Sequence, residues 1–207
     1  MGYSSLIENL EKDGCLKTPL IKRAFNEIKR ADFIPEKLKT EAAVDAPLPI
    51  GFGQTISQPR TVAFMLELLQ PQPGDKILDI GAGSGWTTAL LAFCVGEQGR
   101  IFAIERLREL CEFGRNNVLK YNFIKKKIVE FFCVDGSRGL PDGAPFDKIL
   151  VSAAAEEIPP ALKEQLKVNG RLVLPVKNSV WLVEKITEDK FREKEFFGFS
   201  FVPLINE

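Results

Sequence analysis

The stretch KILDIGAGSG at residues 76–85 decides the fold class of this chain. Its apolar start predicts a buried strand at residues 77–80, and the strand runs into a loop with little side-chain bulk. Gly81, Gly83 and Gly85 lack a Cβ, so the backbone can take unusual dihedral angles and a ligand can lie against it. The N-terminus of a following helix also presents unpaired N–H groups to an anionic or polar ligand. The stretch therefore predicts a nucleotide-like cofactor site in an α/β protein.

Two kinds of cofactor compete for this loop. The dinucleotide fingerprint is G-x-G-x-x-G, and its third glycine allows a helix to pack closely on a strand. Gly81 and Gly83 fit, but the third position falls on Trp86, whose indole cannot replace a glycine. Asp79 adds a carboxylate at the strand end, which suits an amine-bearing ligand and repels a pyrophosphate. The pattern D-x-G-x-G-x-G resembles motif I of the S-adenosylmethionine (SAM) methyltransferases, while a strand–turn–helix without a ligand stays open as the alternative.

Length and composition predict one modest domain, residues 1–207. The chain has 207 residues, 45% of them hydrophobic, which is enough to bury a single core. Within that domain we expect helices and a substrate or active-site loop in residues 1–70. A SAM-binding core is expected in residues 71–176 and edge strands in residues 177–207.

The charge balance argues against nucleic acid and membrane as partners. Lysine plus arginine and aspartate plus glutamate both number 28, so no overall field attracts either partner. The lysine run at residues 125–127 is typical of a solvated turn. No apolar run approaches the roughly 20 residues that a membrane-spanning helix needs.

The chain contains no histidine. Its absence removes the usual general base and the usual zinc ligand, so catalysis must use carboxylates, hydroxyls and positioning, and we expect no metal site. The four cysteines, Cys15, Cys94, Cys111 and Cys133, form no C-x-x-C pair. Cys94 and Cys133 lie in apolar segments and are predicted to be small buried hydrophobic residues rather than disulfide partners. This pattern fits a reducing cytoplasm.

Strand-like and helix-like segments alternate through the middle of the chain. Strands are predicted at residues 77–80, 101–105, 128–134, 148–152 and 171–176, and helices at residues 87–95, 107–120 and 160–166. The alternation predicts an α/β fold with a doubly wound, mostly parallel sheet, like that of SAM methyltransferases. Residues 180–185 and 196–202 are predicted to form an antiparallel hairpin at the sheet edge. Thr18 and Pro19 predict the N-cap and the first residue of a helix that runs to about residue 29. A second helix is predicted from residue 57 onward, and both precede the sheet.

Acidic residues follow the second and third predicted strands. Ligands of open α/β sheets bind outside the carboxyl ends of the strands, where these residues are expected. Glu105 is predicted to accept both hydroxyls of a ribose. Asp135 and Gly136 are predicted either to face the adenine amine or to form a simple turn.

The segment PLPIGFGQTISQP, residues 47–59, precedes a helix. On the residues alone, Ser57 is best interpreted as the N-cap of that helix. That interpretation leaves the apolar, glycine-bearing loop before it unexplained. Such a loop can close over a ligand while Thr55 and Ser57 offer hydroxyls to a carboxylate.

Several segments together resemble the protein-L-isoaspartate O-methyltransferase family. In chain order they are FIPEKLK, DAPLPIGFGQTISQP, LDIGAGSGWTTALLA, FAIER, VDGSRGLPDGAPFDKILVSAAAEEIPPALKEQLKVNGRLVLPV and FVPL. The resemblance runs from about residue 33 to residue 204. The glycine motif alone is typical of all SAM methyltransferases, whereas GQTISQP and APFDKILVSAAAEEIP are much more specific.

The resemblance implies an enzyme that methylates the free α-carboxylate of L-isoaspartyl residues, which form from aged asparagine and aspartate. The ester collapses to a succinimide and hydrolysis regenerates some normal aspartate, so damaged proteins are the implied partners. Ser57 is the implied active-site serine. Thr55, Ile56, Ser57 and Gln58 are implied to line the cofactor and substrate cleft, and Gly81, Gly83, Glu105, Asp135 and Gly136 to bind SAM.

The chemistry of the residues agrees with this reaction. The methyl group of SAM is already activated and a carboxylate is already a nucleophile at neutral pH, so no proton has to be removed. Catalysis then rests on alignment and exclusion of water, with Ser57 as a hydrogen-bonding positioner because no base is present to activate it. Two alternatives stay open, a SAM-dependent methyltransferase for another carboxylate and a non-catalytic SAM-binding module. Trp86 disfavours a nicotinamide oxidoreductase, and a cytoplasmic monomer is expected.

Overall fold

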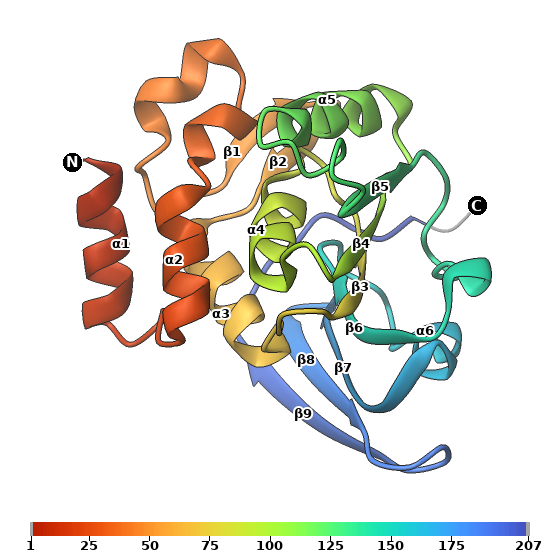
Figure 1. Cartoon of the computed structure of the whole chain (residues 1–207). Helices are drawn as coiled ribbons and strands as arrows, with labels where there is room; N and C mark the ends of the chain where they lie inside the picture. Colours follow the sequence, from red (N-terminus) through yellow and green to blue (C-terminus); the bar gives the residue numbers. More distant parts are fainter. Residues whose placement is uncertain (1, 206–207) are drawn as a thin grey trace.

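The structure is a computed structural model that describes residues 2–205. Its main elements, drawn in Figure 1, are α1 (Tyr3–Lys12), α2 (Pro19–Glu27), β1 (Leu48–Gly51), β2 (Gln54–Ile56), α3 (Pro59–Leu69), β3 (Lys76–Ile80), α4 (Trp86–Val95), β4 (Arg100–Ile104), α5 (Arg108–Leu119), β5 (Val129–Phe132), β6 (Phe146–Val151), α6 (Pro160–Glu164), β7 (Leu166–Val176), β8 (Ser179–Lys185) and β9 (Phe191–Phe197). Short 3-10 turns lie at Arg30–Phe33, Glu36–Glu41 and Pro141–Gly143.

The central sheet has seven strands in the order β5-β4-β3-β6-β7-β8-β9. The pairs from β5 to β7 are parallel, and β8 and β9 add antiparallel strands at one edge. In Figure 1 these last strands, in blue, form the lower part of the molecule. The predicted α/β fold with a mostly parallel sheet and an antiparallel C-terminal edge is confirmed.

Alternate residues of the central strands β3, β4 and β6 enter different cores. Ile77 and Leu150 belong to the core under α2, α3, α4 and α5, whereas Leu78 and Ile149 belong to the core on the opposite face with α6. Successive side chains of a strand point to opposite faces, so a sheet covered on both sides has continuously apolar strands. The sheet is thereby doubly wound, with helices on both faces, and the ends of its strands lie between these two helical layers.

The N-terminal region contains more structure than the sequence indicated. Helix α2 begins at Pro19, as predicted, but the hydroxyl of Thr18 does not cap it and instead donates to Glu67 Oε2 at 2.7 Å. Helix α1 and the β1–β2 hairpin were not predicted. Figure 1 shows α1 and α2 (red to orange) side by side at one flank of the molecule.

The last strand lies earlier than predicted. Residues 196–202 were expected to form it, but β9 spans Phe191–Phe197 and pairs with β8 along its length. Its charged centre, residues 192–195, hid the strand, because charged side chains are typical of exposed sheet edges and not of buried strands. Within residues 2–205, no helix is both long and apolar enough to cross a membrane.

The prediction for Cys133 was wrong. Cys133 is exposed and forms a disulfide with Cys111 of α5, 22 residues earlier. Cys94 is free and buried in α4, as predicted. The absence of a C-x-x-C pair was misleading because a disulfide depends on which elements pack together and not on close spacing in the sequence. The cysteine pattern therefore does not support a reducing compartment.

Candidate functional site

A cleft of about 840 Å³, its open mouth included, lies at the carboxyl ends of β3, β4 and β6. This is where ligands of open α/β sheets bind. Eight of the ten predicted site residues line it, namely Thr55, Ile56, Ser57, Gly81, Gly83, Glu105, Asp135 and Gly136. They come from four separate segments of the chain, which the fold brings together.

The glycine loop is held against the end of the neighbouring strand β4. The N–H groups of Gly81 and Ala82 both donate to the carbonyl of Ile104, at 2.9 and 3.0 Å. Gly81 and Gly83 have positive φ angles of +77° and +51°, which residues other than glycine rarely adopt. The two glycines therefore present backbone without side-chain bulk to the cleft, which Ala82 and Ser84 of the loop also line.

Gly85 has a packing role. A Cβ on Gly85 would lie 2.7 Å from the carbonyl oxygen of Gly114 and 2.9 Å from Val118 Cγ2, both in α5. The close approach of the glycine loop to α5 thus requires glycine at this position. In the dinucleotide fingerprint the third glycine allows close packing of a helix, and that position falls here on Trp86. In this chain Gly85, one residue earlier, allows the close packing.

Glu105 is the carboxylate at the end of β4, and it is 7% exposed. Its Oε2 accepts a hydrogen bond from the N–H of Gly83 at 2.9 Å, and its Oε1 accepts one from the N–H of Leu107 at 3.0 Å. A carboxylate oxygen has more than one lone pair, so both oxygens keep acceptor capacity. Glu105 is a preorganised acceptor at the edge of the cleft.

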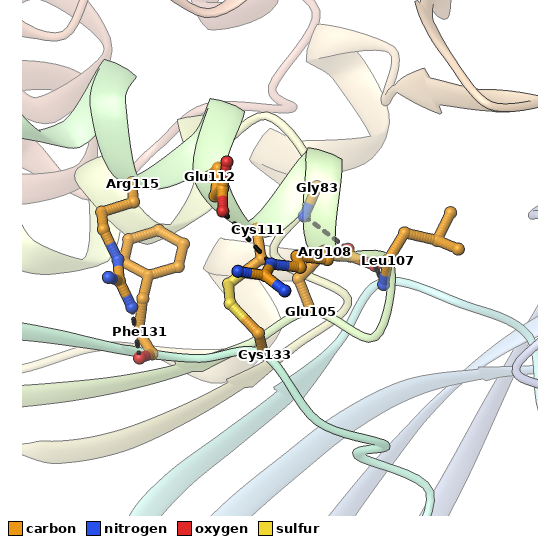
Figure 2. Close-up of a disulfide and its surroundings, with 9 residues drawn as sticks. All are labelled: Gly83, Glu105, Leu107, Arg108, Cys111, Glu112, Arg115, Phe131 and Cys133. Carbon is orange, nitrogen blue, oxygen red and sulfur yellow. Dashed lines mark hydrogen bonds and ion pairs between the residues drawn. A yellow bond between two sulfur atoms is a disulfide. The ribbon is translucent and has the colours of Figure 1, made fainter.

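The Cys111–Cys133 disulfide lies next to this carboxylate. Figure 2 shows it under α5, with Glu105, Gly83 and Leu107 grouped to one side. Cys111 N–H donates to the carbonyl of Leu107 at 2.8 Å. The disulfide thus joins the helix that follows Glu105 to the strand end that leads into Asp135.

Asp135 and Gly136 form the turn that was one of the two alternatives left open by the sequence. Asp135 accepts hydrogen bonds from the N–H and hydroxyl of Ser137, at 2.8 and 2.9 Å, which is a turn. Both residues also line the cleft. A Cβ on Gly136 would lie 2.7 Å from Ile80 Cγ2 and 3.0 Å from Ile104 Cγ2, so glycine is needed for the turn to cover the ends of β3 and β4.

Asp79 and Gln58 do not line this cleft, but Gln58 lines the groove that adjoins it. Asp79 is fully buried; its Oδ2 accepts a hydrogen bond from the Thr88 hydroxyl at 2.6 Å, and its Oδ1 has no partner among the described residues. Burial raises the pKa of Asp79 to about 7, against the opposing effect of Thr88. Gln58 donates to the carbonyl of Asp45 at 3.0 Å.

Ser57 is not an N-cap. Helix α3 is preceded by Gln58 as its cap residue, so Ser57 lies one position further out and lines the cleft. Ser57 also lines an adjoining groove of about 1550 Å³, which shares Thr55, Ser152 and Val202 with the cleft. The interpretation of Ser57 as a cap was wrong, and the serine stands where the cleft and the groove meet.

Residues 202–205 form a wall of the cleft that the predicted site residues did not include. Ala154, just after β6, donates its N–H to the carbonyl of Val202 at 2.8 Å and accepts from the N–H of Leu204 at 2.7 Å. These bonds extend the segment across the end of the sheet. The only sequence signal for it was the FVPL element of the family resemblance.

The lining fits a nucleoside. Glu105 offers carboxylate oxygens for a pair of hydroxyls, while Ile80, Ile104 and Leu110 supply apolar surface for a flat base. The glycine loop supplies backbone without bulk next to them. Ligand sites with mostly apolar walls and a few placed polar groups are the usual form of a cofactor site.

Comparisons with known proteins agree with this geometry. A family model described as protein-L-isoaspartate(D-aspartate) O-methyltransferase matches residues 1–207. The chain is 44% identical over 206 residues to the protein-L-isoaspartate O-methyltransferase of Methanopyrus kandleri, covering 98% of this chain and 90% of the relative. It is 44% identical over 211 residues to the protein of the same name from Thermococcus sibiricus, covering 99% and 94%.

One solved structure has the same fold over nearly the whole chain. It is a Plasmodium falciparum protein described as a protein-L-isoaspartate O-methyltransferase, in complex with S-adenosyl-L-homocysteine. The TM-score is 0.89, with 99% of both chains covered and 24% sequence identity. At that identity the likeness establishes the fold.

Proposed function

The chain belongs to the protein-L-isoaspartate(D-aspartate) O-methyltransferase family, and from this premise we propose how its cleft carries out the family reaction. The chain is a SAM-dependent protein carboxyl O-methyltransferase that transfers a methyl group to the free α-carboxylate of L-isoaspartyl residues in damaged proteins. The roles of the individual residues are our proposals.

SAM would bind in the cleft of about 840 Å³. Glu105 would accept hydrogen bonds from the ribose hydroxyls, because its carboxylate is fixed by the N–H groups of Gly83 and Leu107. Asp135 and Gly136 would lie beside the adenine. Bound SAM supplies a methyl group that its sulfonium has already activated.

Asp79 would act from behind the glycine loop rather than by contact, because it is buried and absent from the lining. Its bond to Thr88 ties the end of β3 to helix α4 and so fixes the loop between them. Gln58 lines the groove and would also support the Ser57 segment through its bond to Asp45.

The acceptor peptide would lie in the groove next to the cleft. The observation that carries this proposal is the position of Ser57, which lines both the cleft and the groove. Its hydroxyl would hold the isoaspartyl carboxylate at the junction, where an oxygen of the carboxylate faces the donor. Residues 202–205 close the other side and help to exclude water. Holding two reactants in a reactive orientation is a large source of rate enhancement.

Methyl transfer from labelled SAM to a synthetic isoaspartyl peptide, beside its normal aspartyl twin, tests this function. We expect base-labile methanol to be released from the isoaspartyl peptide alone. Ser57→Ala should lower turnover while the dissociation constant for SAM stays unchanged. Bound SAM with transfer to neither peptide would favour another carboxylate substrate or a non-catalytic binding role.

The cytoplasmic location and the monomeric state expected from the sequence remain proposals. Cell fractionation tests the first, and light scattering of the purified protein tests the second.

A further inference from the structure

Arg30 is a buried cation beside the proposed acceptor site. It begins the 3-10 turn Arg30–Phe33 and is 0% exposed. In the described part of the chain its hydrogen-bond partners are carbonyl oxygens, not carboxylates. Taking a charge out of water is costly, and here the N–H donors of Nη1 and Nη2 meet four carbonyls. The charge of Asp45 adds an attraction, while Nε of Arg30 has no partner among the described residues.

The four carbonyls bound by Arg30 belong to residues 42–46, just before the groove residue Pro47, and to Ser57, which itself lines the groove. Nη1 donates to Ala42 and Val44, at 3.3 and 2.9 Å. Nη2 donates to Ala46 at 2.7 Å and to Ser57 itself at 3.2 Å. One planar group therefore fixes the segment before β1 against the backbone of Ser57.

Arg30 also packs on the helix that follows the glycine loop. Its guanidinium carbon lies 5.5 Å from the ring centroid of Trp86, the first residue of α4. Trp86 is itself fixed by an edge-on contact with Phe25 of α2, at 5.5 Å between ring centroids. A guanidinium over an indole face is an attractive cation–π pair. Burial lowers the pKa of Arg30 to about 10, so the group is still charged at neutral pH.

We propose that Arg30 is a positioning residue for methyl transfer, which holds Ser57 at a fixed place relative to the helix after the glycine loop. The proposal rests on the proposed function of Ser57 and goes beyond it. Arg30 does not line the cleft, so it acts through the backbone of Ser57 and not on a substrate. Lysine is a poor substitute, because a single ammonium cannot reproduce the spacing of the two guanidinium nitrogens.

Arg30→Met and Arg30→Lys test this role in the full-length protein. For Arg30→Met we expect kcat with an isoaspartyl peptide to fall about 100-fold, because a small misplacement of a reacting group has an effect of this size. The dissociation constant for SAM should stay within about threefold, since the glycine loop is held by other bonds. Arg30→Lys should recover part of the activity, to about 10-fold below wild type.

Arg171→Met is the matched control. Arg171 also donates to a backbone carbonyl, that of Leu68 at 3.0 Å, and it pairs with Glu184 at 3.0 Å, but it does not line the cleft or the groove. The Arg171→Met substitution should lower the melting temperature of the protein and leave kcat unchanged. A fall in kcat for Arg30→Met no larger than for this control would overturn the proposal. If Arg30→Met does not fold, the same comparison is made with Arg30→Lys.

A double-mutant cycle with Ser57→Ala separates positioning from a general structural role. If Arg30 acts through Ser57, Arg30→Met should lower kcat only about threefold when Ser57 is already alanine, since residues that act as a unit are not additive. Full additivity of the two effects would contradict the proposal. The wild-type control distinguishes this failure from failure of the proposed function, because in the latter case the wild type itself does not methylate the peptide.

Discussion

Glu105 Oε2 accepts a hydrogen bond from the N–H of Gly83 at 2.9 Å, so the end of β4 and the glycine loop after β3 are one connected unit. The other carboxylate oxygen is held by the N–H of Leu107. Two backbone donors prevent the carboxylate from rotating. A ligand that bonds to Glu105 therefore meets an acceptor that loses little freedom on binding.

We expect Glu105→Gln to weaken SAM binding about 10- to 100-fold, the range for loss of a hydrogen bond to a charged group. The amide NH₂ also has to face an N–H of Gly83 or Leu107, which displaces the loop. Calorimetric titration with SAM measures the change. Glu109→Gln, an exposed position in α5, is the control and should bind as wild type does. Equal affinity for SAM in both variants would show that Glu105 is not a ligand.

Gly85→Ala should be strongly destabilising. The added Cβ meets Gly114 at 2.7 Å, and φ at this position is +81°. We expect a loss of about 3 kcal/mol in the free energy of unfolding, from backbone strain plus overpacking. Gly74→Ala is a matched control, because φ is +87° there but nothing lies within 4 Å of the new Cβ. It should lose only about 1 kcal/mol, the cost of the left-handed backbone alone. Equal losses in denaturant titrations would rule out the close contact with α5.

Removing the Cys111–Cys133 disulfide should lower both stability and SAM affinity. The bond closes a loop with a sequence separation of 22, for which the chain-entropy estimate is about 3 kcal/mol. It also joins the two segments that carry Glu105 and Asp135. Thermal melting and SAM titration of wild type, with and without reductant, measure both effects. Cys133→Ser should match the reduced wild type and be insensitive to reductant; a reductant effect that persists in this variant would contradict the assignment.

Asp79 should make stability depend on pH. Burial raises its pKa in the folded state to about 7, against the opposing effect of the Thr88 hydrogen bond and with a smaller rise from Glu105, whereas the ordinary pKa of an aspartate is 3.8. Below the pKa of the unfolded state the carboxyl is protonated in both states, and its contribution to the free energy of unfolding is complete. This contribution is lost as pH rises toward and through the pKa of the folded state. Asp79→Asn cannot ionise. From about pH 4 to about pH 7, between the unfolded and folded pKa values of Asp79, wild type should therefore lose unfolding free energy relative to this variant, and above that range the difference should level off. A difference that stays constant in denaturant titrations would show that Asp79 titrates normally.

The order of strands and helices was predictable because it depends on local pattern. The apolar run before Gly81 determines a strand at its own position, and the prolines at the starts of α2 and α3 mark helix starts at theirs. The positions of Glu105 and Asp135 followed from the rule that ligands bind at strand ends. These residues line the cleft as expected.

Features that depend on packing between distant segments were not predictable. The Cys111–Cys133 pair exists because α5 lies on β5, and the wall at residues 202–205 exists because the chain crosses back to Ala154. Asp79 looked like a ligand in the sequence, but its side chain bonds to Thr88 and stays buried. No sequence pattern indicated a role for Arg30, because its hydrogen-bond partners are backbone carbonyls up to 27 residues away in the chain.

The most direct measurement is a crystal structure of the protein with S-adenosyl-L-homocysteine and an isoaspartyl peptide. We predict that Glu105 lies within hydrogen-bond distance of the ribose hydroxyls and that Ser57 Oγ lies within hydrogen-bond distance of the isoaspartyl carboxylate, which faces the sulfur. A peptide bound away from the groove, or a carboxylate turned away from Ser57 and the sulfur, would contradict the central claim that Ser57 joins the donor cleft to the acceptor groove.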